Sequence, residues 1–178
     1  MSKVIFDGKG FKSEKVCAKQ VNGETISSKH LQYQDIDCYV QSTDGKKLTA
    51  SVKDQTYSTK QGYTTVQIEL EQTNTRTNSK VNGCFHNNKS DYYFWLVFYE
   101  DKEQWIIIKS SILKKYVQDN KDKLKKWCTS TSTESKNRSY NRTYDRSEGV
   151  MINISTLAKL GQLKELTVYE VSNRIQRH

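Results

Sequence analysis

The segment between residues 35 and 71 carries acidic side chains and a lysine at alternating positions of three strand-like runs, QDIDCYV, LTASVKDQ and TVQIELEQ. Side chains alternate between the two faces of a strand, so Asp35 and Asp37 share one face of the first run. By the same rule, Ser51 and Lys53 share one face of the second run. If the three runs form neighbouring strands, they present their carboxylates and an ammonium group on a single surface.

The third run completes this set, because Glu69 and Glu71 lie opposite the apolar Ile68 and Leu70. Carboxylates beside a lysine suit metal-assisted hydrolysis of a phosphodiester. They hold Mg²⁺, which keeps several waters and binds the substrate phosphate, and the metal lowers the pKa of a bound water. The lysine orients or deprotonates that water, or stabilises the transition state. The expected cofactor is Mg²⁺, with Mn²⁺ as its substitute, whereas each residue taken singly also fits a solvated strand surface.

This order of strands resembles the PD-(D/E)XK, or restriction-endonuclease-like, nuclease superfamily. Asp37, upstream of the tripeptide Ser51-Val52-Lys53, looks like the superfamily aspartate followed by its acid-any-lysine motif, and Asp35 is an equally placed alternative. Ser51 stands where the superfamily usually has an acid, and no proline precedes either aspartate. Some members resemble this chain in having a serine there and a glutamate further along. The resemblance implies a metal held by Asp37 and Glu69 and a catalytic set of Asp37, Lys53, Glu69, Asp35, Glu71 and Ser51, in which Glu71 is the alternative to Glu69.

Two further motifs, Gly83-Cys84-Phe85 and Ser90-Asp91-Tyr92-Tyr93, resemble a pattern in small phage and mobile-element members of this superfamily. The resemblance implies an α/β fold with a restriction-endonuclease-like core, in which helices flank a mixed central sheet. A helix over 11–21, carrying Glu14, would border the site. Many relatives act as homodimers. Two functions remain open: a Mg²⁺-dependent DNA endonuclease, or a catalytically inactive DNA-binding or assembly module on the same fold.

A net charge of +9 over 178 residues favours a polyanionic partner, and we expect DNA. Lysines and arginines that neutralise phosphates release counterions, which supplies sequence-independent affinity. The charge is concentrated after residue 108, where a solvated helix face is the alternative explanation. The candidate nucleic-acid-binding residues are Lys114, Lys115, Lys125, Lys126, Arg138, Arg142 and Arg146.

Periodicity predicts one domain over 1–178 with a mobile basic loop over about 129–148. No apolar run approaches the roughly 20 residues that span a bilayer, and the N-terminus lacks a signal pattern, so we expect an intracellular protein without a membrane partner. The four cysteines are too widely spaced for a zinc ribbon and are expected to be free core thiols. Strands are predicted over 33–42, 47–55, 64–73, 92–99, 105–109 and 149–154, and helices over 11–21, from Ser110 or Ser111 to about Trp127, and from Ser155.

Overall fold

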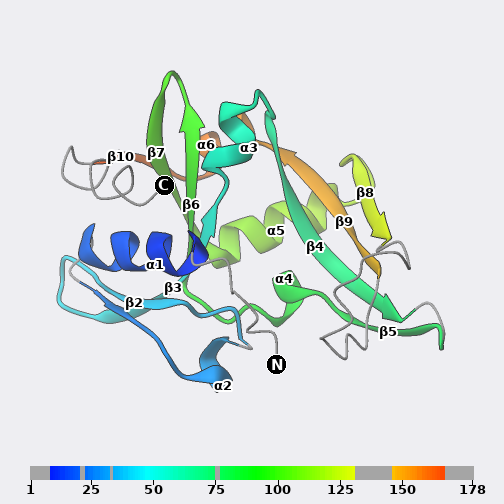
Figure 1. The fold of residues 1–178 in the computed structure, drawn as a ribbon, viewed down its shortest axis with the longest axis horizontal. Coiled ribbons are helices and arrows are strands. Elements are labelled where there is room, and N and C mark those ends of the chain that lie inside the picture. Colours follow the sequence, from blue (N-terminus) through cyan, green and yellow to red (C-terminus); the bar gives the residue numbers. More distant parts are fainter. Residues whose placement is uncertain (1–8, 21–22, 33, 75–76, 131–145, 167–178) are drawn as a thin grey trace, which may run out of the picture.

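The computed structural model describes residues 9–20, 23–32, 34–74, 77–130 and 146–166, and these form an α/β arrangement of two sheets with flanking helices (Figure 1). A six-stranded sheet has the order β1-β2-β3-β6-β7-β10, and a four-stranded sheet has the order β5-β4-β9-β8. One apolar cluster joins the two sheets, because it contains Val66 and Ile68 of β4 together with Tyr93 and Trp95 of β6. The predicted α/β class is confirmed.

The six-stranded sheet is mixed. Within this sheet, the neighbouring strands β3 and β6 are parallel, and every other described pair of neighbouring strands is antiparallel. This agrees with the expected mixed central sheet. Its strands are β1 (Glu24–Thr25), β2 (Cys38–Gln41), β3 (Lys47–Asp54), β6 (Tyr92–Tyr99), β7 (Lys102–Lys109) and β10 (Gln162–Glu165).

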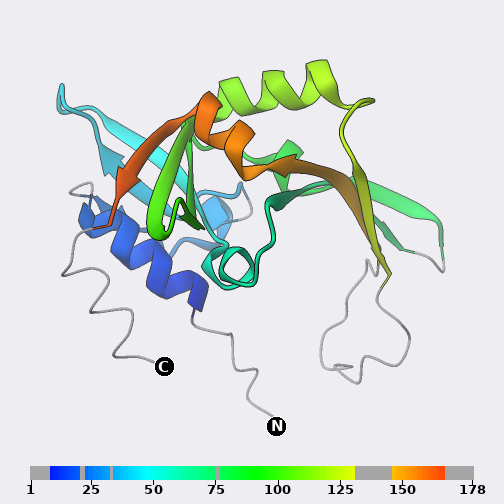
Figure 2. The ribbon, with the colours of Figure 1, turned by 90° about the horizontal axis from the view of Figure 1, so that it is seen from above.

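Strand β6 is the centre of the fold and is covered on both faces, as its YYFWLVFY sequence predicts. Tyr93 and Trp95 enter one apolar cluster, while Phe94 and Leu96 enter a second cluster on the other face. The second cluster also takes Cys17 from α1 (Lys9–Gln20). Figure 2 shows α1 on one side of this sheet and α5 (Ser110–Asn120) on the other.

Strand β4 (Thr65–Asn74) does not lie beside β3, and this corrects the expectation of three neighbouring strands. The alternation in β4 was predicted correctly, since Val66, Ile68 and Leu70 are buried. Alternation suits a strand with one exposed face. The strand next to β3 is covered on both faces, and the almost wholly apolar β6 fills that position. The other strands of the second sheet are β5 (Ser79–Asn82), β8 (Lys126–Ser130) and β9 (Arg146–Asn153).

The helix after β7 is shorter than predicted. It ends at Asn120, and Trp127 lies in β8, where its indole N–H lies 3.3 Å from the Ile68 carbonyl oxygen and 3.1 Å from that of Val150. Lys109 is the N-cap, and the Ser110 hydroxyl, 3.2 Å from that of Ser90, does not cap the helix. The predicted loop over 129–148 overlaps the end of β8 and the start of β9, and residues 131–145 lie outside the described part.

The remaining helices are short: α2 (Lys29–Gln32), α3 (Thr56–Lys60), α4 (Cys84–Asn87) and α6 (Ile154–Leu160). None of the helices in the described ranges is long and apolar enough to cross a membrane. Cys17 and Cys38 are buried free thiols, as expected, whereas Cys84 and Cys128 are exposed.

Candidate functional site

Asp35 and Asp37 precede β2 instead of lying within it. Asp35 has a φ of 55°, in the left-handed region, so strand alternation does not govern the direction of its side chain. The N–H of Asp37 donates to the Ala50 carbonyl at 2.9 Å, and Asp37 Oδ2 accepts the N–H of Val52 at 2.7 Å. A turn locked onto β3 therefore brings the two acids together.

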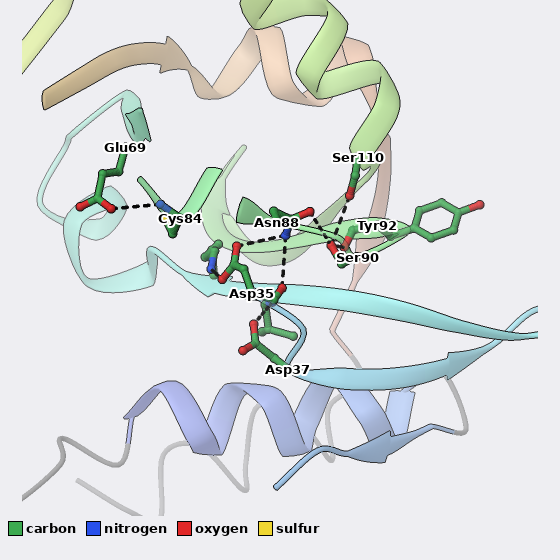
Figure 3. Close-up of polar contacts among 10 residues, drawn as sticks. Asp35, Asp37, Glu69, Cys84, Asn88, Ser90, Tyr92 and Ser110 are labelled. Atoms are coloured by element: carbon green, nitrogen blue, oxygen red, sulfur yellow. Dashed lines mark hydrogen bonds and ion pairs between the residues drawn. The ribbon is translucent and has the colours of Figure 1, made fainter. Parts of the chain in front are cut away.

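Lys53, at the end of β3, forms an ion pair with Asp35 Oδ1. Both side chains are half-buried, with exposed fractions of 26% for Lys53 and 12% for Asp35. The Asn88 amide donates to Asp35 Oδ2 at 3.1 Å and to the Asp35 carbonyl oxygen at 3.2 Å (Figure 3). Both carboxylate oxygens of Asp35 are thus engaged, one by Lys53 and the other by Asn88.

The pKa of Lys53 is raised, although its burial acts in the opposite direction. Burial disfavours the ammonium form, but the charges of Asp35 and Asp37 and the bond to Asp35 outweigh it. Lys53 therefore remains protonated at neutral pH. It places a positive charge beside the two aspartates.

Glu14 reaches the same corner from α1. Three and four residues later, Cys17 and Ala18 are buried against the sheet, so helical spacing places Glu14 on that face. The pKa of Glu14 is raised from 4.5 to about 7, first by burial and then by the charge of Asp37, while the charge of Lys53 acts against the rise. No hydrogen bond or ion pair to Glu14 is present among the described residues.

Asp37 lies between the start of β2 and α1 (Figure 3). Burial raises its pKa, with Lys53 and the Val52 N–H acting against that rise. The corner thus gathers the carboxyl groups of Glu14, Asp35 and Asp37 around the ammonium of Lys53. Negative charge is in excess there when all three acids are ionised.

Two buried hydroxyl groups beside these acids, Ser51 Oγ and Tyr93 OH, have no partner of good hydrogen-bond geometry among the described residues, although Ser51 lies close enough to Asp37 to lower its pKa. Ser51 is 0% exposed and Tyr93 is 2% exposed, and they are direct partners in the β3–β6 pairing. Burial raises the pKa of Tyr93, and the charge of Asp35 adds to the rise. Since buried polar atoms are almost always paired, these hydroxyl groups have bonding capacity left for a water or ligand.

Glu69 lies on the other side of Cys84 from Asp35 (Figure 3). Its Oε1 accepts the Cys84 N–H at 3.2 Å and the Gln72 amide at 3.1 Å. The approach requires a glycine, because a Cβ on Gly83 would lie 2.8 Å from the Glu69 carbonyl oxygen. No hydrogen bond or ion pair within the described residues joins Glu69 to Asp37, and the metal pair of Asp37 and Glu69 stays a prediction.

Glu71 lies on the β4–β5 hairpin and pairs with Lys80 at 2.6 Å. A β-bulge between Glu69 and Glu71 shifts the register with β9. Within the described part of the chain, no group of three or more His, Cys, Asp or Glu side chains is placed to hold a metal ion.

The basic candidates occupy different environments. Lys114 Nζ donates to the Asn88 carbonyl at 2.5 Å, whereas Lys115 pairs with Asp119 at 2.8 Å. Lys125 and Lys126 are exposed and follow α5, and Lys126 begins β8. Arg146 begins β9 and pairs with Glu148, while Arg138 and Arg142 lie outside the described residues.

Asn88 is the site residue that sequence reasoning missed. It is 1% exposed, and its Oδ1 accepts the Ser90 hydroxyl at 3.1 Å while its amide holds Asp35. Its position in the polar stretch NNKSD gives no signal of burial.

No family model, curated protein or solved structure matches this chain.

Proposed function

We propose that this protein is a Mg²⁺-dependent DNA endonuclease that hydrolyses phosphodiester bonds at the corner formed by Glu14, Asp37 and Lys53. One observation carries the proposal: half-buried acids with raised pKa values face a lysine that remains charged. Clusters of perturbed acids and bases are typical of functional sites. The mixed sheet, with a β2–β3 hairpin followed by a parallel β6, supports a restriction-endonuclease-like core.

The side chains present fit a magnesium ion. Mg²⁺ usually binds through one or two carboxylates and keeps several waters, so Glu14 and Asp37 suffice without a third acid. The hydroxyl group of Tyr93, which has no partner among the described residues, is available to such waters. When bound, the ion would lower the pKa of a water and neutralise charge on the phosphate. Glu14 here replaces Glu69 as the second carboxylate.

Lys53 and Asp35 have separate roles in this proposal. The protonated Lys53 stabilises the negative charge that builds on the phosphate in the transition state. Asp35 positions Lys53 through their ion pair, and Asn88 fixes Asp35 in turn. Of the two aspartates, this proposal takes Asp37 as the metal ligand, because both carboxylate oxygens of Asp35 already have partners.

A second function is a catalytically inactive DNA-binding or assembly module on the same fold. The observation that favours it is the lack of a group of three or more metal-ligand side chains within the described residues. The net charge of +9 supports DNA as the partner under either function.

The experiment that separates the two functions is plasmid cleavage in Mg²⁺ by Lys53→Ala and Lys80→Ala. Both lysines lie on strands and pair with a carboxylate, but only Lys53 lies in the proposed site. We expect Lys53→Ala to lose about 10²–10³-fold in rate and Lys80→Ala to cleave normally. DNA binding in Ca²⁺ serves as the folding control. Equal activity of Lys53→Ala and the parent would exclude the catalytic assignment, and an inactive parent that binds DNA would favour the module.

A further inference from the structure

Lys114 differs from most of the paired lysines in the described structure because it has no carboxylate partner there. Its ammonium group donates to the carbonyl of Asn88, which directly follows α4. Asn88 in turn holds Asp35, which holds Lys53. Lys114 therefore approaches the acidic corner from the α5 side.

The tether to Asn88 leaves Lys114 with donors to spare. A lysine ammonium has three N–H donors, and one donates to the Asn88 carbonyl at 2.5 Å. Lys114 is only partly exposed, and burial lowers its pKa while the charge of Asp35 opposes this. Because this half-buried ammonium group has no carboxylate partner among the described residues, a bound anion would stabilise its charge.

A second lysine extends this face of α5. Lys121 is the C-cap of α5, has helical φ and ψ, and follows Lys114 by seven residues, so the two lie on one side of the helix, about 10 Å apart along its axis. His86 of α4 lies near both, and burial together with the charges of Lys121 and Lys114 lowers its pKa. Lys115, rotated away from this line, already pairs with Asp119.

We propose that Lys114 and Lys121, with His86 beside them, bind backbone phosphates of the DNA strand on one side of the reacting phosphate. The inference rests on the proposed function, since it places the reacting phosphate beside Asp37 and Lys53. It narrows the substrate to a polynucleotide that spans several phosphates, because a mononucleotide ester cannot reach both lysines. The strand then runs from the acidic corner along the groups that α4 and α5 present.

The test is the salt dependence of DNA binding, measured by fluorescence anisotropy with a labelled duplex in Ca²⁺. A lysine that neutralises one phosphate contributes about 0.9 to the slope of log K against log salt. We expect Lys114→Gln and Lys121→Gln each to lower the slope by about that amount, and Lys115→Gln to leave it unchanged. Lys114→Arg, which keeps the charge, should restore the parent slope. Thermal unfolding of each variant checks the fold.

The outcomes separate this inference from the proposed function. If Lys114→Gln and Lys121→Gln keep the parent slope, or if Lys115→Gln lowers it equally, the phosphate contacts are refuted even when the parent cleaves DNA. A reduced slope for Lys114→Gln that Lys114→Arg fails to restore also refutes them, since Lys114 would then act only through Asn88. If the slopes change as expected but neither the parent nor any variant cleaves DNA in Mg²⁺, the phosphate contacts are supported and the proposed hydrolysis is refuted.

Discussion

The two sheets of this protein carry similar acid and lysine pairs in opposite environments. In the six-stranded sheet, Asp35 and Lys53 have exposed fractions of 12% and 26%, and Asp37 and Glu14 crowd beside them. In the four-stranded sheet, Glu71 and Lys80 are 36% and 58% exposed. Their ion pair lies on an open hairpin.

The difference between the two ion pairs lies in how far their surroundings exclude solvent. A solvent-exposed ion pair is screened and contributes about 0–1 kcal/mol to stability. Charges held in a half-buried corner interact more strongly, because the local dielectric response is weaker. Of these two ion pairs, the one on the six-stranded sheet combines burial with an excess of acids.

The largest contrast is expected between Asp37→Asn and Glu71→Gln. If Asp37 holds the metal, Asp37→Asn should abolish the rise in unfolding temperature that Mn²⁺ causes in the parent. That rise corresponds to about 2.7 kcal/mol when the metal is at 100 times its dissociation constant. Glu71→Gln should respond to Mn²⁺ as the parent does. Differential scanning fluorimetry in EDTA and in Mn²⁺ measures both.

The opposite pair of Mn²⁺ responses would place the metal site on the other sheet. A normal Mn²⁺ response in Asp37→Asn combined with a lost response in Glu71→Gln would move the metal site to the four-stranded sheet. Glu69→Gln, measured alongside, separates Glu69 from Glu71 in that case.

A smaller contrast concerns the stability of the metal-free protein against pH. The pKa of Glu14 rises from 4.5 to about 7 on folding, so the folded protein binds the proton more tightly than the unfolded chain. The resulting stabilisation is fully present below pH 4.5 and is lost as the pH rises through about 7. Glu14→Gln should therefore be more stable than the parent at pH 8, by about 2 kcal/mol once solvent screening of this part-exposed carboxyl is allowed for, and similar to it at pH 4.

Urea unfolding in EDTA across this pH range provides the measurement. Glu24→Gln is the matched control, because Glu24 is an exposed strand acid whose side chain is 78% accessible. Parallel stability curves for the parent and Glu14→Gln would show that Glu14 ionises normally and would remove it from the corner.

The smallest expected contrast is between two neighbouring asparagines. Asn88→Ala removes the amide that holds Asp35 and leaves buried polar atoms unpaired, which costs about 1–3 kcal/mol. Asn87→Ala removes an exposed side chain whose amide donates to the Asn82 carbonyl at 3.1 Å, so we expect a change within about 0.5 kcal/mol. Chemical denaturation measures the free energy of unfolding of both variants. An equal loss of stability in the two would show that the hydrogen bonds from Asn88 to Asp35 add no stability beyond that of an exposed asparagine.

The sequence predicts a strand well when the order of apolar and polar residues within that strand shows which of its faces are buried. Alternation located β4, and the wholly apolar run located β6, because both patterns depend on side chains within the strand. The pairing partner of β3 was predicted wrongly, because partner choice depends on a segment almost forty residues away. The helix beyond Asn120 was also overextended, since Trp127 bonds to carbonyl groups of β4 and β9 that no local pattern reveals.

The site was predicted in part for the same reason. Asp35, Asp37 and Lys53 do come together, but the left-handed φ of Asp35, and not strand parity, arranges them. Asn88 escaped notice because its partner lies 53 residues earlier in the chain. Whether these residues carry out hydrolysis stays a prediction.

The parallel pairing of β3 with β6 has a consequence for folding. The two strands are separated by residues 55–91, which contribute α3, β4, β5 and α4 before the chain returns. Closing such a loop loses entropy before any contact compensates, and non-local parallel pairing forms slowly. A chain that has made only the β2–β3 hairpin already contains Asp37 and Lys53, but Asn88 has yet to arrive. The ion pair of Asp35 and Lys53, with Asn88 bound to Asp35, is therefore complete only in molecules in which β6 has paired with β3.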